Sequence, residues 1–140
     1  MKTIFLAGRL LSLVAVIIFS ISAAGAQAAD AELTVEDRRQ IIEVLLTERF
    51  ANADEKTIFI SKTNLSDDLL KVFPTVKNKQ IRFVSKDEAA ATGVCAFEFG
   101  DFQTIGKFVS VSFGDCSEGM AYDFKKYGEK WKSVGLTIVK

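Results

Sequence analysis

The two cysteines are the residues whose type and spacing best predict a specific chemistry. The 140-residue chain contains Cys95 and Cys116 and no other cysteine. An even number of cysteines favours a disulfide in an oxidising compartment, whereas a redox-active pair is more often a Cys-x-x-Cys motif. We therefore predict a structural Cys95–Cys116 disulfide, near the open end of a hairpin formed by residues 94–115.

Histidine is absent from the chain, and this limits both catalysis and metal binding. Without histidine, the Ser–His–Asp and Cys–His catalytic arrangements and all His-ligated metal sites are excluded. Two cysteines also cannot supply the thiolates of a four-cysteine zinc site. We predict no cofactor and no metal site, and the sequence favours a protein that is not an enzyme.

Carboxylates are the remaining candidates for catalysis. Glu98 and Asp123 each interrupt an apolar strand, so either could be the base of a small hydrolase or isomerase if it lay in an apolar pocket. Strand alternation instead places both on the face opposite the phenylalanines, toward solvent. Asp67 and Asp68 are adjacent on a predicted helix, where their side chains diverge and suit the helix N-terminus better than a shared ion.

A calcium site would require four acidic residues near the later turns to come together. Their spacing does not follow a known calcium-binding loop, and acidic residues after glycine are common in turns. We therefore do not predict a metal site at Asp101, Asp115, Glu118 and Asp123.

Four lysines surround the last predicted turn, at residues 126–130, and three aromatic residues are candidates for exposure at the surface. We expect the lysines to solvate a sheet edge and to discourage pairing with other sheets. The aromatic residues could be exposed and contact a ligand, although a tryptophan at the start of a strand is usually buried. The lysines are Lys125, Lys126, Lys130 and Lys132, and the aromatic residues are Phe102, Tyr127 and Trp131.

Residues 1–28 have the pattern of a secretory signal peptide. Lys2 begins a short basic region, the apolar run covers residues 10–21, and small-x-small patterns follow at residues 24–28. The apolar run is about twelve residues, shorter than the roughly 20 that span a membrane. We therefore predict cleavage and export to a periplasmic or extracellular location, without stable membrane anchoring.

The composition of the remaining chain predicts one packed domain, over residues 30–140. Hydrophobic residues make up 49% of the sequence, which is enough for a core. The whole chain has 18 basic and 18 acidic residues, so removing Lys2 and Arg9 leaves 16 against 18, a net charge of −2. This balance offers no electrostatic footprint for nucleic acid or anionic lipid.

Helix signals occur at three places upstream of the glycine-rich part of the chain. Residues 33–53 carry a wide apolar stripe, with Thr34 as the cap and acidic residues in the first turn. Ser66 can cap a short helix that ends near Pro74, and Ser85 can cap another that stops near Gly93. We expect the long helix to cover a sheet.

Strand signals dominate the last third of the chain, after two candidate strands at residues 56–61 and 80–84. Alternating apolar residues between glycines predict an antiparallel meander over residues 94–139. The first turn is expected at residues 104–107 with a bulge near Gly100, and a turn at Gly100-Asp101 is the alternative. We expect these apolar faces: Cys95, Phe97 and Phe99; Val109, Val111 and Phe113; Met120, Tyr122 and Phe124; Val134, Leu136 and Ile138.

The closing stretch at residues 122–134, with Gly-Glu-Lys-Trp-Lys at its centre, resembles the last hairpin of nuclear-transport-factor-two-like and cystatin-like domains. The resemblance covers some 20 residues and implies a helix before a curved sheet. Relatives of ketosteroid isomerase carry catalytic Asp and Tyr in a cone-shaped pocket, often with a His that this chain lacks. Cystatins inhibit proteases with Gln-x-Val-x-Gly, whereas residues 103–106 (Gln-Thr-Ile-Gly) are one residue short, so inhibition is not carried over.

The sequence thus predicts an α+β domain, with one main helix on a curved antiparallel sheet and one disulfide. Its role is expected to be non-catalytic binding of an unknown protein or small molecule, through the concave sheet face or a loop end. A small pocket enzyme with a carboxylate base is one alternative, and a structural envelope protein is another.

Overall fold

The first helix, α1, begins at the cap that the sequence predicts. In the computed structural model, which describes residues 32–139, α1 spans Val35–Phe50. The Thr34 side chain accepts a hydrogen bond from the Asp37 backbone N–H, and the Asp37 carboxylate accepts one from the Thr34 backbone N–H. This capping box satisfies two donors that the helix leaves unpaired. The buried face of α1 consists of Ile41, Ile42, Leu45, Leu46 and Phe50.

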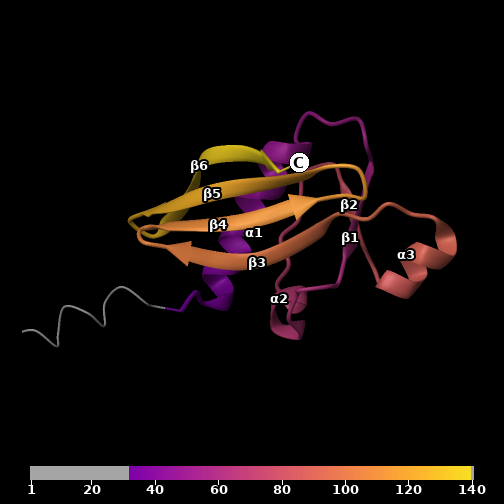
Figure 1. The fold of residues 1–140 in the computed structure, drawn as a ribbon, viewed down its shortest axis with the longest axis horizontal. Helices are drawn as coiled ribbons and strands as arrows, with labels where there is room; N and C mark the ends of the chain where they lie inside the picture. Colours follow the sequence, from indigo (N-terminus) through magenta and orange to yellow (C-terminus); the bar gives the residue numbers. More distant parts are fainter. Residues whose placement is uncertain (1–31, 140) are drawn as a thin grey trace, which may run out of the picture. The chain divides into compact units, whose positions relative to one another are not determined.

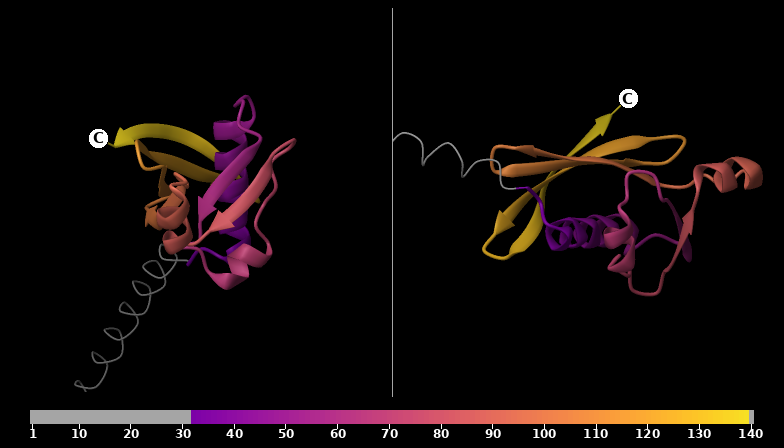
Figure 2. Two further views of the ribbon diagram at one scale, coloured as in Figure 1. Left: turned by 90° about the vertical axis from the view of Figure 1, so that its right-hand side faces the viewer. Right: turned by 90° about the horizontal axis from the view of Figure 1, so that it is seen from below.

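Four strands form the main sheet, and α1 crosses its inner face (Figure 1; Figure 2). The strands are β3 (Glu98–Ile105), β4 (Phe108–Gly114), β5 (Gly119–Tyr127) and β6 (Lys130–Val139). They pair antiparallel in chain order, as a meander does. The predicted α+β class, with a helix packed on an antiparallel sheet, is confirmed.

The β3–β4 hairpin has the turn and the bulge that its pattern predicts. Gly106 lies in the turn with a φ of 60°, a left-handed value that glycine adopts without strain. The register shifts between Phe99 and Phe102, so Gly100 and Asp101 lie within a bulge. The alternative turn at Gly100-Asp101 is wrong, because β3 continues through both residues.

The apolar face predicted for the last strand is wrong in part. A second bulge lies where Asp123 pairs with Gly135 and Phe124 pairs with Ser133, which leaves Val134 as the extra residue. The bulge shifts the alternation, so Leu136 pairs with the buried Tyr122. Val134 is 45% exposed rather than part of the core.

A smaller sheet, which the sequence did not predict, joins the two upstream strands. β1 (Thr57–Ser61) and β2 (Gln80–Val84) pair in parallel through a crossover that contains α2 (Asp67–Lys71). Phe97 links this pair to the main sheet: its N–H donates to Phe59 O at 2.8 Å, and its carbonyl accepts from Ser61 N–H at 2.7 Å. The fold is therefore two short sheets around one helix, rather than one sheet.

The two remaining helix caps agree with the sequence. Ser66 caps α2 by accepting from the Leu69 N–H. Ser85 caps α3 (Lys86–Thr92), which ends at Gly93 with a φ of 69°. The α3 helix buries none of its residues, and Figure 1 shows it extending away from the sheet.

The core lies between α1 and the two sheets. Phe97 is central, because its ring meets Phe50 edge-on at 5.0 Å and stacks on Phe113 at 5.1 Å between ring centroids. Such aromatic pairs stabilise a core beyond the area they bury. The buried cluster also includes Ile58 and Ile60 from β1, Leu69 from α2, and Val109, Val111, Tyr122, Phe124 and Trp131 from the main sheet.

The secretory segment predicted at residues 1–28 lies outside the described residues. Within residues 32–139, none of the helices combines the length and apolarity that a membrane-spanning helix requires.

Candidate functional site

The structure joins Cys95 and Cys116 in a disulfide, as the sequence predicts. Their Cα atoms are 5.7 Å apart, within the usual range for a disulfide. Glu98 and Gly114 form the last paired position of the β3–β4 hairpin, and the disulfide follows immediately beyond it. It therefore closes the open end of that hairpin.

The carboxylates that could have carried catalysis lie on the outer face of the main sheet. Glu98 is exposed. Asp123 is half-buried and pairs with Ser110 on β4 and Gly135 on β6. Neither residue lies in the buried core between α1 and the sheet, where an apolar environment would be found.

The acidic residues considered for calcium do not converge. Asp115 accepts hydrogen bonds within its own turn, from the N–H and hydroxyl of Ser117 and from the Glu118 N–H. The bonds from Ser117 hold the pKa of Asp115 below its ordinary value. No group of three His, Cys, Asp or Glu residues in the described part of the chain could hold a metal ion.

Asp37 connects distant elements of the fold. The sequence predicted an acidic residue in the first helical turn, but not these long-range contacts. Its Oδ1 atom accepts from Lys126 Nζ at 2.8 Å and from the Trp131 indole N–H at 2.9 Å. Partial burial alone would raise the pKa of Asp37, but the hydrogen bonds from Lys126, Trp131 and Thr34 outweigh it and hold the pKa well below its ordinary value. Asp37 thereby fastens the β5–β6 hairpin to the start of α1.

The lysines near the last turn do not act together at a sheet edge. Lys125 and Lys126 belong to β5, which is an interior strand, so the prediction that all four solvate an edge is wrong. Lys126 points inward to Asp37. Lys125 and Lys132 pair across β5 and β6 on the outer face, and both lie near the Tyr127 ring.

The three aromatic residues considered for ligand contact have different environments. Trp131 is 8% exposed and belongs to the core. Phe102 is half-buried, and the Arg38 guanidinium lies 5.7 Å from the centre of its ring. Tyr127 is 48% exposed, so it alone of the three is available at the surface.

A hollow on the inner face of the sheet is a candidate ligand site. We call it the groove; its volume is about 430 Å³, within the range of small-molecule sites. A smaller hollow of about 20 Å³ shares Arg49, Met120 and Tyr122 with it. The groove is lined by Glu48, Arg49, Met120, Tyr122, Ser133 and Leu136.

The polar groups of the groove are mainly hydrogen-bond donors. Arg49 lies over the rings of Phe50 and Phe97, at 5.1 and 5.7 Å from their centres. Among residues 32–139 its guanidinium forms neither an ion pair nor a side-chain hydrogen bond. The Tyr122 hydroxyl contacts only Met120 Sδ, a weak acceptor, at 3.6 Å. Burial raises the pKa of Tyr122, so this hydroxyl remains a donor at neutral pH.

The apolar lining of the groove completes this arrangement. Leu136 is 56% exposed although it pairs with Tyr122 on the inner face, because α1 does not cover this part of β6. Met120 is half-buried beside it. Two apolar side chains therefore adjoin two donors that form no hydrogen bond to a strong acceptor, although Asp115 and Glu118 line the smaller hollow beside Arg49. The groove could not be predicted from the sequence beyond its residue types, because it depends on where α1 ends over the sheet.

A larger hollow, of about 660 Å³, lies near the disulfide. Its lining includes Gly93, Gly100, Gly114 and alanines of α3, so backbone and small side chains make up much of its surface. The charged groups at it, Lys86, Glu98 and Asp115, come from separate segments. It therefore offers less convergent chemistry than the groove.

Comparison of the chain with protein-family models, with curated proteins and with solved structures gave no match.

Proposed function

We propose that this protein is an exported, non-catalytic binding module that holds a small amphipathic molecule in the groove. The single observation that carries the proposal is Arg49, a half-buried guanidinium with no acceptor among the described residues. Because Arg49 lines the groove and forms no hydrogen bond to a described residue, its guanidinium is available to bind a ligand oxygen.

The composition of the groove indicates the class of ligand. Arg49 and Tyr122 both donate, so the head group should carry acceptor oxygens, such as a carboxylate or phosphate. Met120 and Leu136 would contact an apolar body. Glu48, at the rim, is exposed and adds a negative charge there, so a ligand should place its anionic group on the Arg49 side.

The disulfide supports the proposed location. A Cys95–Cys116 bond persists in the periplasm or outside the cell, whereas cytosolic thiols are kept reduced. Together with the signal-peptide pattern at residues 1–28, it favours export and release into a periplasmic or extracellular space.

The two alternative functions receive less support from the same geometry. A pocket enzyme would need an enclosed carboxylate, but Glu48 of the groove and Glu98 at the larger hollow are exposed. The half-buried Asp115 at that hollow accepts hydrogen bonds within its own turn. The contacts of Arg49 with two phenylalanine rings also suit a purely structural envelope protein, but that role does not use the groove beside them. A binding role accounts for this feature directly.

The experiment is native mass spectrometry of the protein purified from its own source, with and without organic extraction. We expect a bound small molecule on the native protein that extraction removes. Arg49→Met should reduce its occupancy at least roughly tenfold, which corresponds to about 1.4 kcal/mol, while Arg49→Lys should reduce it less.

Arg82→Met is the matched control, because Arg82 also lies near an aromatic ring, that of Phe59, but on β2 and away from the groove. Leu136→Ser tests the apolar contact at an exposed position that should not affect folding. Native protein without a bound molecule, or equal occupancy in the Arg49 and Arg82 variants, would contradict the proposal.

A further inference from the structure

A second surface, on the outer face of the main sheet, combines exposed apolar and cationic side chains. At the end of the sheet that carries the β3–β4 and β5–β6 turns, strand pairing places one residue from each strand in a row. Tyr127 lies two residues beyond Lys125 on the same face. We call these residues the tip patch: Ile105, Phe108, Lys125, Lys132 and Tyr127.

The apolar members of the tip patch are unusually exposed for their size. Ile105 is 60% exposed, Phe108 44% and Tyr127 48%. The next outer-face positions along the sheet are polar or small, since Gln103 pairs with Ser110 and Ser110 pairs with Asp123. Exposed apolar residues that are scattered singly need no explanation, but a cluster at one end of a sheet marks an interaction surface.

The charge around the tip patch is positive, although the whole chain is not. Lys107 in the β3–β4 turn and Lys130 at the start of β6 add to Lys125 and Lys132, and the nearby acids are Glu129 and, in the next outer-face row, Asp123. This gives four positive charges against two negative charges. Lys126 is not counted, because it points to the inner face and is neutralised by Asp37. The net charge of the mature chain therefore conceals a local cationic cluster.

The lysines and the aromatic rings of the tip patch share one surface. Lys125 Nζ lies 5.3 Å from the centre of the Tyr127 ring and 5.8 Å from that of Phe108, and Lys132 Nζ lies 5.6 Å from the Tyr127 ring. These distances are within cation–π range. A partner that contacts the rings therefore meets ammonium groups at the same time, which requires an anionic partner.

We propose that the tip patch docks the protein reversibly on an anionic lipid surface. Ile105 and Phe108 would enter the boundary between head groups and acyl chains, while the lysines contact lipid phosphates. Ile105 favours lipid over an acidic polysaccharide, because sugars stack on aromatic rings and gain little from an aliphatic side chain. Its position next to a hairpin turn also lets it project beyond the sheet.

The tip patch does not depend on the proposed ligand site. The groove lies on the inner face, with Tyr122 and Leu136, whereas the tip patch lies on the outer face at the hairpin turns. The two surfaces can therefore be tested separately. Docking through so few side chains should be weak and reversible, unlike a membrane-spanning anchor.

The test is co-sedimentation of the mature, oxidised protein with phosphatidylcholine vesicles, with and without about 30% phosphatidylglycerol. We expect binding to the anionic vesicles that is lost without phosphatidylglycerol and falls as ionic strength rises. Phe108→Ser should weaken binding at least roughly fivefold, and Lys125→Glu combined with Lys132→Glu should weaken it more.

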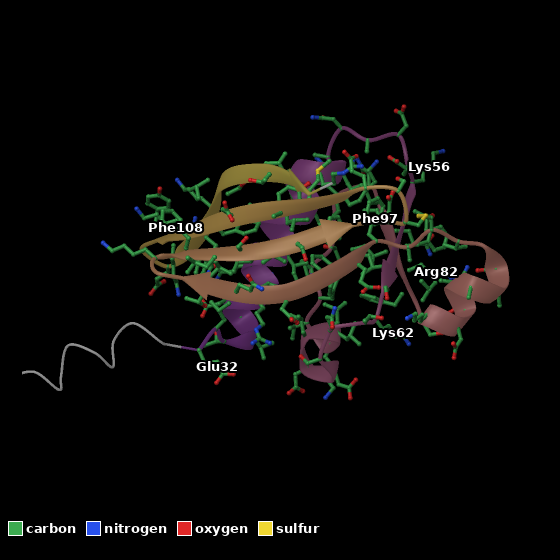
Figure 3. The ribbon with its side chains drawn as sticks, in the orientation of Figure 1. Glu32, Lys56, Lys62, Arg82, Phe97 and Phe108 are labelled. Carbon is green, nitrogen blue, oxygen red and sulfur yellow. A yellow bond between two sulfur atoms is a disulfide. The ribbon has the colours of Figure 1, made fainter. Side chains whose placement is uncertain are left out.

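The matched control is Lys56→Glu combined with Lys62→Glu, which makes the same charge change at exposed positions. Figure 3 shows Lys56 and Lys62 at the opposite end of the molecule from Phe108. The control variant should bind like the unmodified protein. Circular dichroism and thermal unfolding verify that each variant folds. If the double lysine variant fails to fold, the Phe108→Ser variant alone decides the test.

Three outcomes would overturn the proposal. The first is no binding to either kind of vesicle. The second is equal loss of binding in the tip-patch and control variants, because net charge rather than the patch would then be responsible. The third is tight retention on an immobilised acidic polysaccharide with no binding to vesicles, which would assign the patch to a glycan partner.

Discussion

At the scale of single residues, Asp37 forms hydrogen bonds both within the first turn of α1 and to the last hairpin. Its carboxylate completes the capping box of α1 and accepts from Lys126 and Trp131, which are 89 and 94 residues away in the sequence. The carboxylate is only 15% exposed, so its hydrogen bonds are shielded from competing water. Asp37 therefore contributes to local helix formation and to the packing of the last hairpin.

Replacing Asp37 by Asn should lower the free energy of unfolding by about 1–3 kcal/mol at pH 7, since it removes charge-assisted hydrogen bonds. Urea unfolding monitored by circular dichroism measures this change. Asp101→Asn is the control, because Asp101 is exposed and forms no ion pair with a described residue. Equal effects of the two substitutions would contradict the structural role of Asp37.

The same variant predicts how stability depends on pH. The folded-state pKa of Asp37 is lowered, so its contribution is fully present above the unfolded pKa of about 3.9 and is lost as pH falls toward the folded value. The difference in stability between the unmodified protein and Asp37→Asn should therefore be constant near neutrality and shrink below about pH 4. Unfolding at a series of pH values tests this, and a difference that persists unchanged in acid would be inconsistent with it.

At the scale of elements, the β4–β5 turn depends on a close approach of the backbone. A Cβ atom at Gly114 would lie 2.3 Å from the Glu118 carbonyl oxygen and 2.6 Å from the Gly119 Cα. Both are backbone atoms, so no side chain can move aside. The glycine is required here for space and not for its backbone dihedral angles.

We expect Gly114→Ala to destabilise the protein by about 1–3 kcal/mol, because the turn must shift to accommodate the methyl group. Gly119→Ala is the matched control in the same turn, since a Cβ there meets nothing within 4 Å. Thermal unfolding of both variants measures the difference. If both lose the same stability, the cause is strand propensity and not the contact with Glu118.

The disulfide also stabilises this part of the sheet, because it closes the β3–β4 hairpin just beyond the paired residues. A bond that closes a loop between residues 21 positions apart stabilises by about 3 kcal/mol in the chain-entropy model. Reduction should therefore lower the melting temperature by roughly 10–20 °C. Calorimetry of oxidised and reduced protein tests this, with a Cys95→Ser, Cys116→Ser double variant to separate the loss of the bond from other effects of the reductant.

At the scale of the whole molecule, local signals predicted the elements but not how they meet. Thr34, Ser66 and Ser85 cap the three helices because a side-chain oxygen can satisfy backbone donors only a few residues away. The bulge near Gly100 was predictable because Phe99 and Phe102 are out of phase. These features depend on neighbours in the sequence, which a single chain displays.

The features that the sequence did not reveal all depend on distant partners. Nothing in β1 or β2 indicates parallel pairing, or that Phe97 connects them to the main sheet. The sequence does not show which of the four similar lysines pairs with Asp37. The groove at Arg49 depends on where α1 ends over β5 and β6. Long-range packing decided these outcomes, and local propensity carries no information about it.

Because α1 and the main sheet share one core, we expect them to unfold in a single transition. Leu45 of α1 is fully buried in the cluster that also contains Trp131 of β6. Trp131 is the single tryptophan, so its fluorescence reports on the last hairpin, while circular dichroism at helical wavelengths reports mainly on α1. Because both elements belong to one cluster, the two signals should change at the same denaturant concentration.

Leu45→Ala tests this coupling directly. Removing the side chain should lower the free energy of unfolding by about 2–5 kcal/mol, through lost burial and the cavity that remains. Both signals should shift together, although Leu45 and Trp131 are far apart in the sequence. Val35→Ala is the control, because Val35 is 39% exposed on the same helix and should change stability by less than about 0.5 kcal/mol. If the helical signal alone shifted, α1 would unfold independently of the sheet, and the single-core description would be wrong.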